Sequence, residues 1–270
     1  MSRWIRTALI FLVVAYVALL ILTPLLGLVF GAFSQGGAAL WNALAQPAFA
    51  GAFWRTVWIA ALIVAIHVGF GAAVAWVLVR HRFPGRELLN GLIDMPFAVS
   101  PVVVGYMLLL LFGRQGLLAP LLASLGVRVA FALPGMVLAT LFVTLPFMIR
   151  ELVPVLENFK IEQEQAAATL GAKGWQIFRR VTLPALRWGF IYGITLTFAR
   201  ALGEFGAVLV IGGGIQGRTE TATLFIYRSL DERMYTAAYG AALVLGLVSF
   251  LLVMGTELLR KLEHMRGNSI

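Results

Sequence analysis

Long stretches without a single charged residue are the feature that most restricts how this chain can fold. Residues 7–54 contain no Asp, Glu, Lys or Arg, and further uncharged runs cover 56–79, 95–113, 129–149 and 234–256. A helix needs roughly 20 apolar residues to cross the hydrocarbon core of a bilayer, so each run can supply one crossing. Only 12% of the residues are charged, and soluble domains usually carry about 25%. The sequence therefore predicts an all-α polytopic membrane protein.

Six transmembrane helices are expected. The run 7–54 is too long for one helix, so we place the first helix at 8–30 and interpret the remainder, which contains Gly, Pro, Asn and Gln, as an outer loop. A sixth crossing is expected at 188–211, where Arg200 and Glu204 interrupt the apolar sequence. The first helix is expected to stay in the mature protein, because its apolar stretch exceeds the roughly 7–15 residues of a signal-peptide core.

The distribution of Lys and Arg predicts the topology. With the N-terminus inside, 14 of the 21 basic residues fall on the cytoplasmic side and 6 on the outer side, and Arg200 lies in the membrane. Cytoplasmic segments carry an excess of Lys and Arg, so both termini are expected to be cytoplasmic. The net charge of +9 then reflects topology in a lipid membrane and indicates no nucleic-acid partner. The outer six are Arg55, Arg114, Arg128, Arg218, Arg228 and Arg233.

Metal and cofactor sites are not expected in this chain. It has no cysteine, and its three histidines, His67, His81 and His264, offer no ligand pair at helical spacing. We interpret His67, alone in an apolar run, as a hydrogen-bonding residue inside the helix bundle rather than a proton relay.

The longest hydrophilic segment, 150–187, is expected to be a cytoplasmic loop of two short helices. Residues 162–170 are rich in helix formers and Gly171 supplies a stop. Trp175 and Phe178 share one face of the second helix, and Pro184 is expected to prevent its simple continuation into the next span. The pattern suits docking of a partner protein, but it suits an interfacial helix on lipid headgroups equally well.

The spacing of this loop resembles the EAA loop of ATP-binding-cassette (ABC) importer permeases. Gln165 stands where that family usually has Glu, which removes a charge, and Val181 stands where Ile is usual. The resemblance implies that the loop is a coupling helix docked on an ATPase subunit. The residues that match the motif are Gln165, Ala166, Ala167, Gly171, Val181, Leu183 and Pro184.

Segments 94–103, 135–137, 150–155 and 200–208 extend the resemblance to sulfate and thiosulfate permeases, closest to the W-type transmembrane subunit. This implies a type I ABC importer permease fold in a bacterial cytoplasmic (inner) membrane. It also implies a heterodimer with a T-type permease subunit, two ATPase subunits and an extracytoplasmic sulfate-binding protein. The chain contains no Walker A pattern, so ATP-Mg is expected in the partner ATPase, and this chain is not expected to be an enzyme by itself.

The resemblance also divides the chain into expected units. Residues 1–50 form the first helix with its outer loop, 51–262 form the permease domain that includes the loop 150–187, and 263–270 form a cytoplasmic tail.

Four polar residues within the spans are candidates for the pathway or its gate. Arg200 and Glu204 are four residues apart on one helix face, so they are expected to pair, either to fix helix packing or to border the pathway. Asp94 is interpreted as a helix cap or as part of a gate. Ser100 is expected to satisfy backbone groups freed by the prolines beside it.

Three rival functions remain open from sequence. A molybdate or tungstate ABC permease would share the motifs and would more often be a homodimer. An ion-coupled secondary transporter would show paired inverted repeats and several buried carboxylates. A membrane enzyme would need a cluster of His, Asp and Glu facing one cavity. The last two leave the spacing of the loop unexplained.

Overall fold

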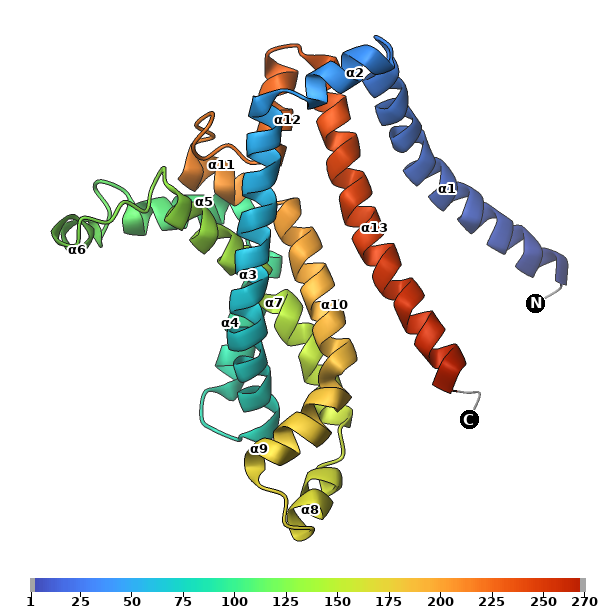
Figure 1. Ribbon diagram of the computed structural model, residues 1–270, viewed down its shortest axis with the longest axis vertical. Helices are drawn as coiled ribbons and strands as arrows, with labels where there is room; N and C mark the ends of the chain where they lie inside the picture. The colour runs from blue at the N-terminus through green and yellow to red at the C-terminus, as the bar shows by residue number, and fades with distance from the viewer. Residues whose placement is uncertain (1–2, 268–270) are drawn as a thin grey trace.

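The computed structural model describes the backbone of residues 3–267 and the side chains of residues 3–262, and within this range it is helical with no strand (Figure 1). The elements, in chain order, are α1 (Arg3–Phe33), α2 (Gly37–Leu44), α3 (Pro47–Arg80), α4 (Arg86–Ala98), α5 (Pro101–Phe112), α6 (Ala119–Ser124), α7 (Leu133–Asn158), α8 (Glu162–Thr169), α9 (Gly174–Ile177), the π-helical turn η1 (Phe178–Thr182), α10 (Leu183–Leu202), α11 (Gly206–Gly212), α12 (Ala222–Asp231) and α13 (Tyr235–Gly267).

Four helices, α1, α3, α7 and α13, are each long and apolar enough to cross a membrane. Two bent pairs add two more spans if each pair crosses once: α4 with α5 at 113°, and α9–α10 with α11 at 56°. The expected total of six is confirmed in this sense, but the third and fifth spans are broken rather than straight. In the third span the break falls at Val99 and Ser100, which are extended, because the residue before a proline disfavours the helical region.

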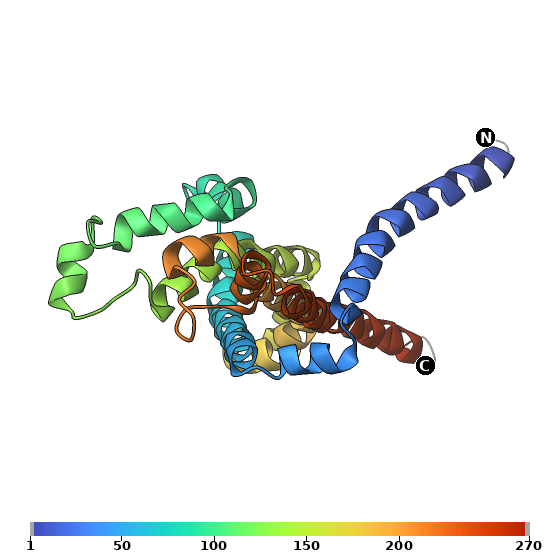
Figure 2. The same cartoon turned by 90° about the horizontal axis from the view of Figure 1, so that it is seen from above.

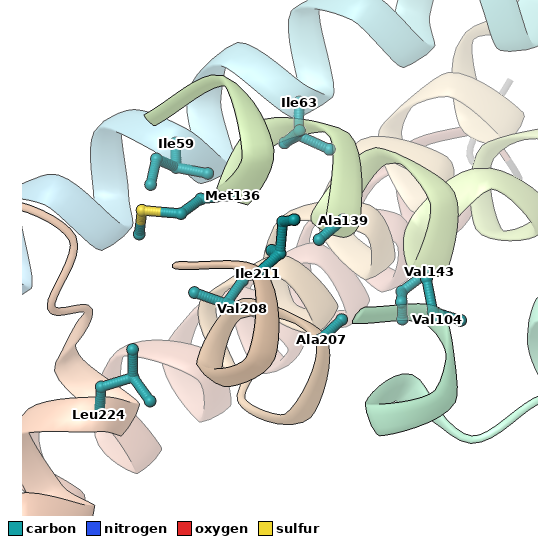
Figure 3. Packing of buried hydrophobic residues seen from close by; sticks show 10 residues of the cluster. All are labelled: Ile59, Ile63, Val104, Met136, Ala139, Val143, Ala207, Val208, Ile211 and Leu224. Carbon is teal, nitrogen blue, oxygen red and sulfur yellow. The ribbon is translucent and has the colours of Figure 1, made fainter. Parts of the chain in front are cut away.

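The centre of the bundle is built by α3, α7 and the two broken spans. The ten side chains in Figure 3 come from α3, α5, α7, α11 and α12 and pack into one buried cluster. Small residues let the helices approach closely, as is common between membrane helices. At Gly193 of α10, an added Cβ would lie 2.5 Å from the Sδ of Met148 in α7, so a larger residue there requires the Met148 side chain to move.

The helices α1 and α13 lie at the side of this bundle. The chain of α1 runs toward the α2 end of the molecule and that of α13 runs away from it, and α1 leans away from the other helices (Figures 1 and 2). None of the most apolar stretch of α1 is buried within the chain. The expected tail 263–270 begins inside α13, and residues 268–270 lie outside the described part.

His67 of α3 is buried and lies 3.0 Å from the Thr144 hydroxyl of α7. The interpretation of His67 as a hydrogen-bonding residue inside the bundle is therefore confirmed.

Candidate coupling loop and translocation site

The loop between α7 and α10 projects at the end of the molecule opposite α2 (Figure 1). Its first helix, α8, ends at Thr169, and Gly171 two residues later has a φ of +84°, in the left-handed region that favours glycine. The amides of Gly171 and Ala172 donate to the carbonyls of Ala168 and Ala167, which closes the helix in a Schellman motif. The expected stop at Gly171 is therefore confirmed, and Leu170 beside it is 89% exposed.

The second helix of the loop continues into the membrane, contrary to expectation. Helix α9 passes through η1 directly into α10, and Pro184 lies in the first turn of α10. The π-turn makes this possible, because the amide of Leu183 bonds five residues back to Phe178 and the local widening accommodates the proline ring. Trp175 and Phe178 share a face as expected, with their rings stacked 5.6 Å apart.

Glu164 ties the loop to the transmembrane helices. Its Oε1 lies 3.3 Å from the Arg80 guanidinium at the end of α3 and accepts a 2.7 Å hydrogen bond from the Thr182 hydroxyl at the end of η1. Arg80 is itself held between the rings of Trp76 and Phe159, 5.3 and 5.7 Å from their centroids. One carboxylate thus joins α8, α3 and the start of α10.

The motif residues themselves form the outer side of the loop. Gln165 and Ala166 of α8 are exposed, as are Leu183 and Pro184, whereas Ala167 and Val181 are half-buried. Motif spacing did not identify Glu164 or Arg80, because Arg80 is 84 residues away in sequence and only the folded chain brings the two together. The signal in the sequence was that Glu164 lies next to Gln165, the motif position where a glutamate is usual.

A hollow of about 390 Å³ lies beside the break between α4 and α5. Residues 96–101 form one wall, and Val143, Phe147 and Arg200 complete the lining. Two predicted residues, Ser100 and Arg200, therefore face the same space. Ser100 is the N-cap residue of α5, where its side chain makes no capping bond and its carbonyl accepts the first helical bond, from Val104.

Arg200 and Glu204 form the expected ion pair, at 2.9 Å. The pair lies at a break rather than in the middle of a helix, since α10 ends at Leu202 and α11 begins at Gly206. The Glu204 side chain is 2% exposed, and its Oε1 accepts a 3.0 Å hydrogen bond from the amide of Ala207 in the first turn of α11. Arg200, at 28% exposure, reaches the hollow while Glu204 lies behind it.

Asp94 does not belong to the hollow and does not cap a helix. It lies inside α4, where its two oxygens accept bonds of 2.7 and 2.5 Å from the Arg150 guanidinium of α7. Arg150 also donates to the Asn90 side chain at 2.9 Å. The interpretation of Asp94 as a cap is wrong, because Arg150, 56 residues further along the chain, supplies its partner and fastens α4 to α7.

No group of His, Cys, Asp and Glu suited to a metal ion occurs among the described residues. The described residues provide an exposed loop between α7 and α10, a carboxylate that links this loop to α3 and to the start of α10, and a hollow lined by one arginine.

This arrangement defines a helical membrane component of a transport system. The chain belongs to the family described as "Binding-protein-dependent transport system inner membrane component", which matches residues 65–263. The fold resembles that in the "Crystal structure of a bacterial ABC transporter involved in the import of the acidic polysaccharide alginate", with a TM-score of 0.78 and 17% identity over 96% of this chain and 95% of that one. The expected ABC importer permease fold is therefore confirmed.

Several relatives have a higher sequence identity to this chain than the alginate transporter does. The sulfate transport system permease protein CysW of Synechocystis is 44% identical over 95% of this chain and 93% of its own length. The corresponding protein CysT of Salmonella typhimurium is 40% identical, covering 91% and 88% of the two chains. Sulfate permease 2 of the Chlamydomonas reinhardtii chloroplast is 48% identical over 90% of this chain, which spans 66% of that relative. The expected resemblance to sulfate permeases is confirmed.

Proposed function

We propose that this chain is the W-type permease subunit of an ATP-driven importer of sulfate or thiosulfate in a bacterial cytoplasmic membrane. Its partners are a T-type permease subunit, two ATPase subunits that bind ATP-Mg, and an extracytoplasmic sulfate-binding protein. Both termini and α8 face the cytoplasm. Identity to a CysW protein, 44%, is higher than identity to a CysT protein, 40%, which supports the W-type assignment.

The observation that carries the proposal is the continuous helical path from the docking loop to the hollow. Glu164 of α8 bonds to Thr182, and α10 begins at the next residue. Helix α10 has 20 residues, which corresponds to about 30 Å at 1.5 Å per residue. Arg200, which lines the hollow, lies in its last turn.

This geometry gives a route by which ATPase closure reaches the pathway. An ATPase subunit that moves the exposed face of α8 also moves η1 and the base of α10, because Glu164 joins them. A rigid helix carries that displacement to Arg200 at its other end. The ion pair at Arg80 fixes α3 to the same point, so α3 and α10 move together.

The charges at the hollow suit brief passage of an anion. Arg200 attracts a dianion electrostatically. The buried carboxylate of Glu204, 2.9 Å from the Arg200 guanidinium, reduces that attraction. A weakly attractive site lets an ion leave as readily as it enters. The second permease subunit is expected to close the open side of the hollow.

The test is sulfate uptake by a strain lacking this gene, with and without a large excess of molybdate. Restored uptake on complementation, with little competition from molybdate, is the expected result. Normal sulfate uptake in the deletion strain together with lost molybdate accumulation would instead assign the chain to a molybdate or tungstate importer. Unchanged uptake of both ions would contradict the proposed cargo.

A further inference from the structure

A second hollow, of about 480 Å³, lies at the end of α7 opposite the docking loop. Two segments that are distant in sequence form its walls: the chain between α5 and α7, with α6 inside it, and the loop after α11. Figures 1 and 2 show α6 and α11 on the same side of the bundle. Because α7 has 26 residues, about 39 Å of helix separates this hollow from α8. With α8 in the cytoplasm, the hollow opens on the outer side.

Three arginines line this hollow, and no acidic residue does: Arg114, Arg128 and Arg218. All three are exposed, and none has an ion pair or side-chain hydrogen bond within residues 3–262. The segments that carry them contain no Asp or Glu, since none occurs between 95 and 150 or between 205 and 219. A solvated surface usually mixes charges of both signs, whereas the lining of this hollow contains only positive ones.

Two nearby carboxylates, Glu220 and Glu232, bind Arg228 instead of lining the hollow. Glu220, next to the α11–α12 loop, is 2% exposed and accepts a 2.6 Å bond from the Arg228 guanidinium. Glu232 accepts a second bond from Arg228, at 2.9 Å. The lining of the hollow therefore contains three arginines and no carboxylate that balances their charge.

The walls of the hollow are held in place by the fold. Phe131 has a φ of +56°, an uncommon conformation for a bulky residue, and its amide donates a 2.7 Å bond to the carbonyl of Ile211. Its ring lies so close to Gly213 that an added Cβ there would be 2.7 Å from Cδ1. The two walls are thus joined at Phe131. Ala132, which caps α7, also lines the hollow and brings the positive end of the helix dipole to it.

We propose that this hollow is an oxyanion-binding site on the permease itself, formed by Arg114, Arg128 and Arg218. Its ligand is a tetrahedral oxyanion, either free sulfate from the outer solution or the phosphate of a lipid headgroup. Guanidinium groups bind such oxyanions through paired hydrogen bonds, and the apolar walls between them concentrate the field of the arginines. The free-sulfate form of the inference rests on the proposed function, because it places a reception site for the cargo at the outer end of this subunit.

The absence of cysteine from the chain makes a direct binding test possible. In an Ala123→Cys variant, the new thiol lies in the lining of the hollow. The whole transporter, without its binding protein, is placed in phosphatidylcholine nanodiscs, and labelling by a neutral maleimide is followed from the mass of this chain. Sulfate is compared with chloride at equal ionic strength. Ala38→Cys on the exposed face of α2 is the control reporter.

Sulfate, but not chloride, is expected to slow labelling at residue 123 and to leave the Ala38→Cys reporter unaffected. Arg128→Gln or Arg218→Gln is expected to raise the half-protecting sulfate concentration about tenfold, as for loss of one hydrogen bond to a charged group. Arg233→Gln, which removes an arginine outside the lining, is expected to change nothing. Slow labelling only in nanodiscs that contain phosphatidylglycerol, with the same dependence on Arg128, would identify the ligand as a lipid headgroup.

If no oxyanion slows labelling, or if only the added binding protein does, the inference is wrong and the hollow is a docking face or a solvated surface. Sulfate uptake by the same Ala123→Cys transporter is measured in parallel. Uptake without protection overturns this inference and leaves the proposed function standing. Protection without uptake overturns the proposed function and leaves the site standing.

Discussion

The ion pair at the break of the fifth span allows its two possible roles to be separated by experiment. Arg200 and Glu204 differ in their surroundings, because the Glu204 side chain is 2% exposed and the Arg200 side chain is 28% exposed. Removing Arg200 as Arg200→Met leaves a buried carboxylate without its counter-charge. Removing the charge of Glu204 as Glu204→Gln leaves an arginine that still reaches the hollow and keeps an oxygen for the amide of Ala207.

The structure therefore predicts unequal losses of stability. Breaking a buried pair by deleting one partner costs about 3–5 kcal/mol when the remaining charge stays buried, which applies to Arg200→Met. For Glu204→Gln the loss is that of one charge-assisted contact, about 1.5–3 kcal/mol. The double variant Arg200→Met/Glu204→Gln removes both charges and is expected to recover most of the stability that Arg200→Met loses.

The assay combines thermal unfolding of the purified transporter with sulfate uptake by the same variants. A pair that only fixes packing predicts that the double variant recovers both stability and uptake. Because Arg200 lines the hollow, we expect the double variant to recover stability while uptake stays low. An Arg200→Met protein as stable as the Glu204→Gln protein would refute the burial argument, and full uptake by the double variant would refute the role of Arg200 in the pathway.

Three further substitutions test the coupling loop and the helix packing. Glu164→Gln weakens the link between α8 and the bundle, so more ATP should be hydrolysed per sulfate imported, whereas Glu162→Gln on the exposed face should leave the ratio unchanged. Gly171→Val should destabilise the end of α8 by about 1–2 kcal/mol, because φ is +84° there and Val disfavours the left-handed region. Pull-downs with this variant should therefore recover fewer ATPase subunits. The control Gly171→Asn should recover more of them than Gly171→Val. Gly193→Leu should reduce the yield of folded protein in size-exclusion chromatography, since its Cβ alone would lie 2.5 Å from Met148.

Local sequence was sufficient for the features that depend on neighbouring residues. The spans followed from the length of uncharged runs, and the ends of α8 followed from a run of helix formers and Gly171. The pairing of Arg200 with Glu204 followed from their spacing of four residues, although Glu204 lies just beyond the end of α10. Each of these inferences needs only a window of about 20 residues or fewer.

Features that depend on distant partners could not be predicted in the same way. Asp94 was expected to cap a helix or to form part of a gate, yet its partner Arg150 comes from another helix, 56 residues away. Proline at position 184 was expected to end a helix, but a π-turn absorbs it, and such turns have no reliable sequence signal. The basic hollow was also missed, because topology counting treats Arg114, Arg128 and Arg218 only as outer charges.

The bends in the third and fifth spans could not be predicted either, because each break depends on the other. Hydropathy averages along the chain and gives the length of a span, but it contains no information on direction. Helices α5 and α11, the second halves of the two bent pairs, pack against each other through glycines. An added Cβ at Gly105 of α5 would lie 2.9 Å from the carbonyl oxygen of Ala207, and one at Gly206 of α11 would lie 3.0 Å from the side chain of Val102. A straight third span would carry α5 away from α11 and would remove the wall of the hollow at residues 96–101.

The hollow at Arg200 thus exists because both spans are broken. We expect α5 and α11 to move as one body when α10 is displaced from the cytoplasmic side.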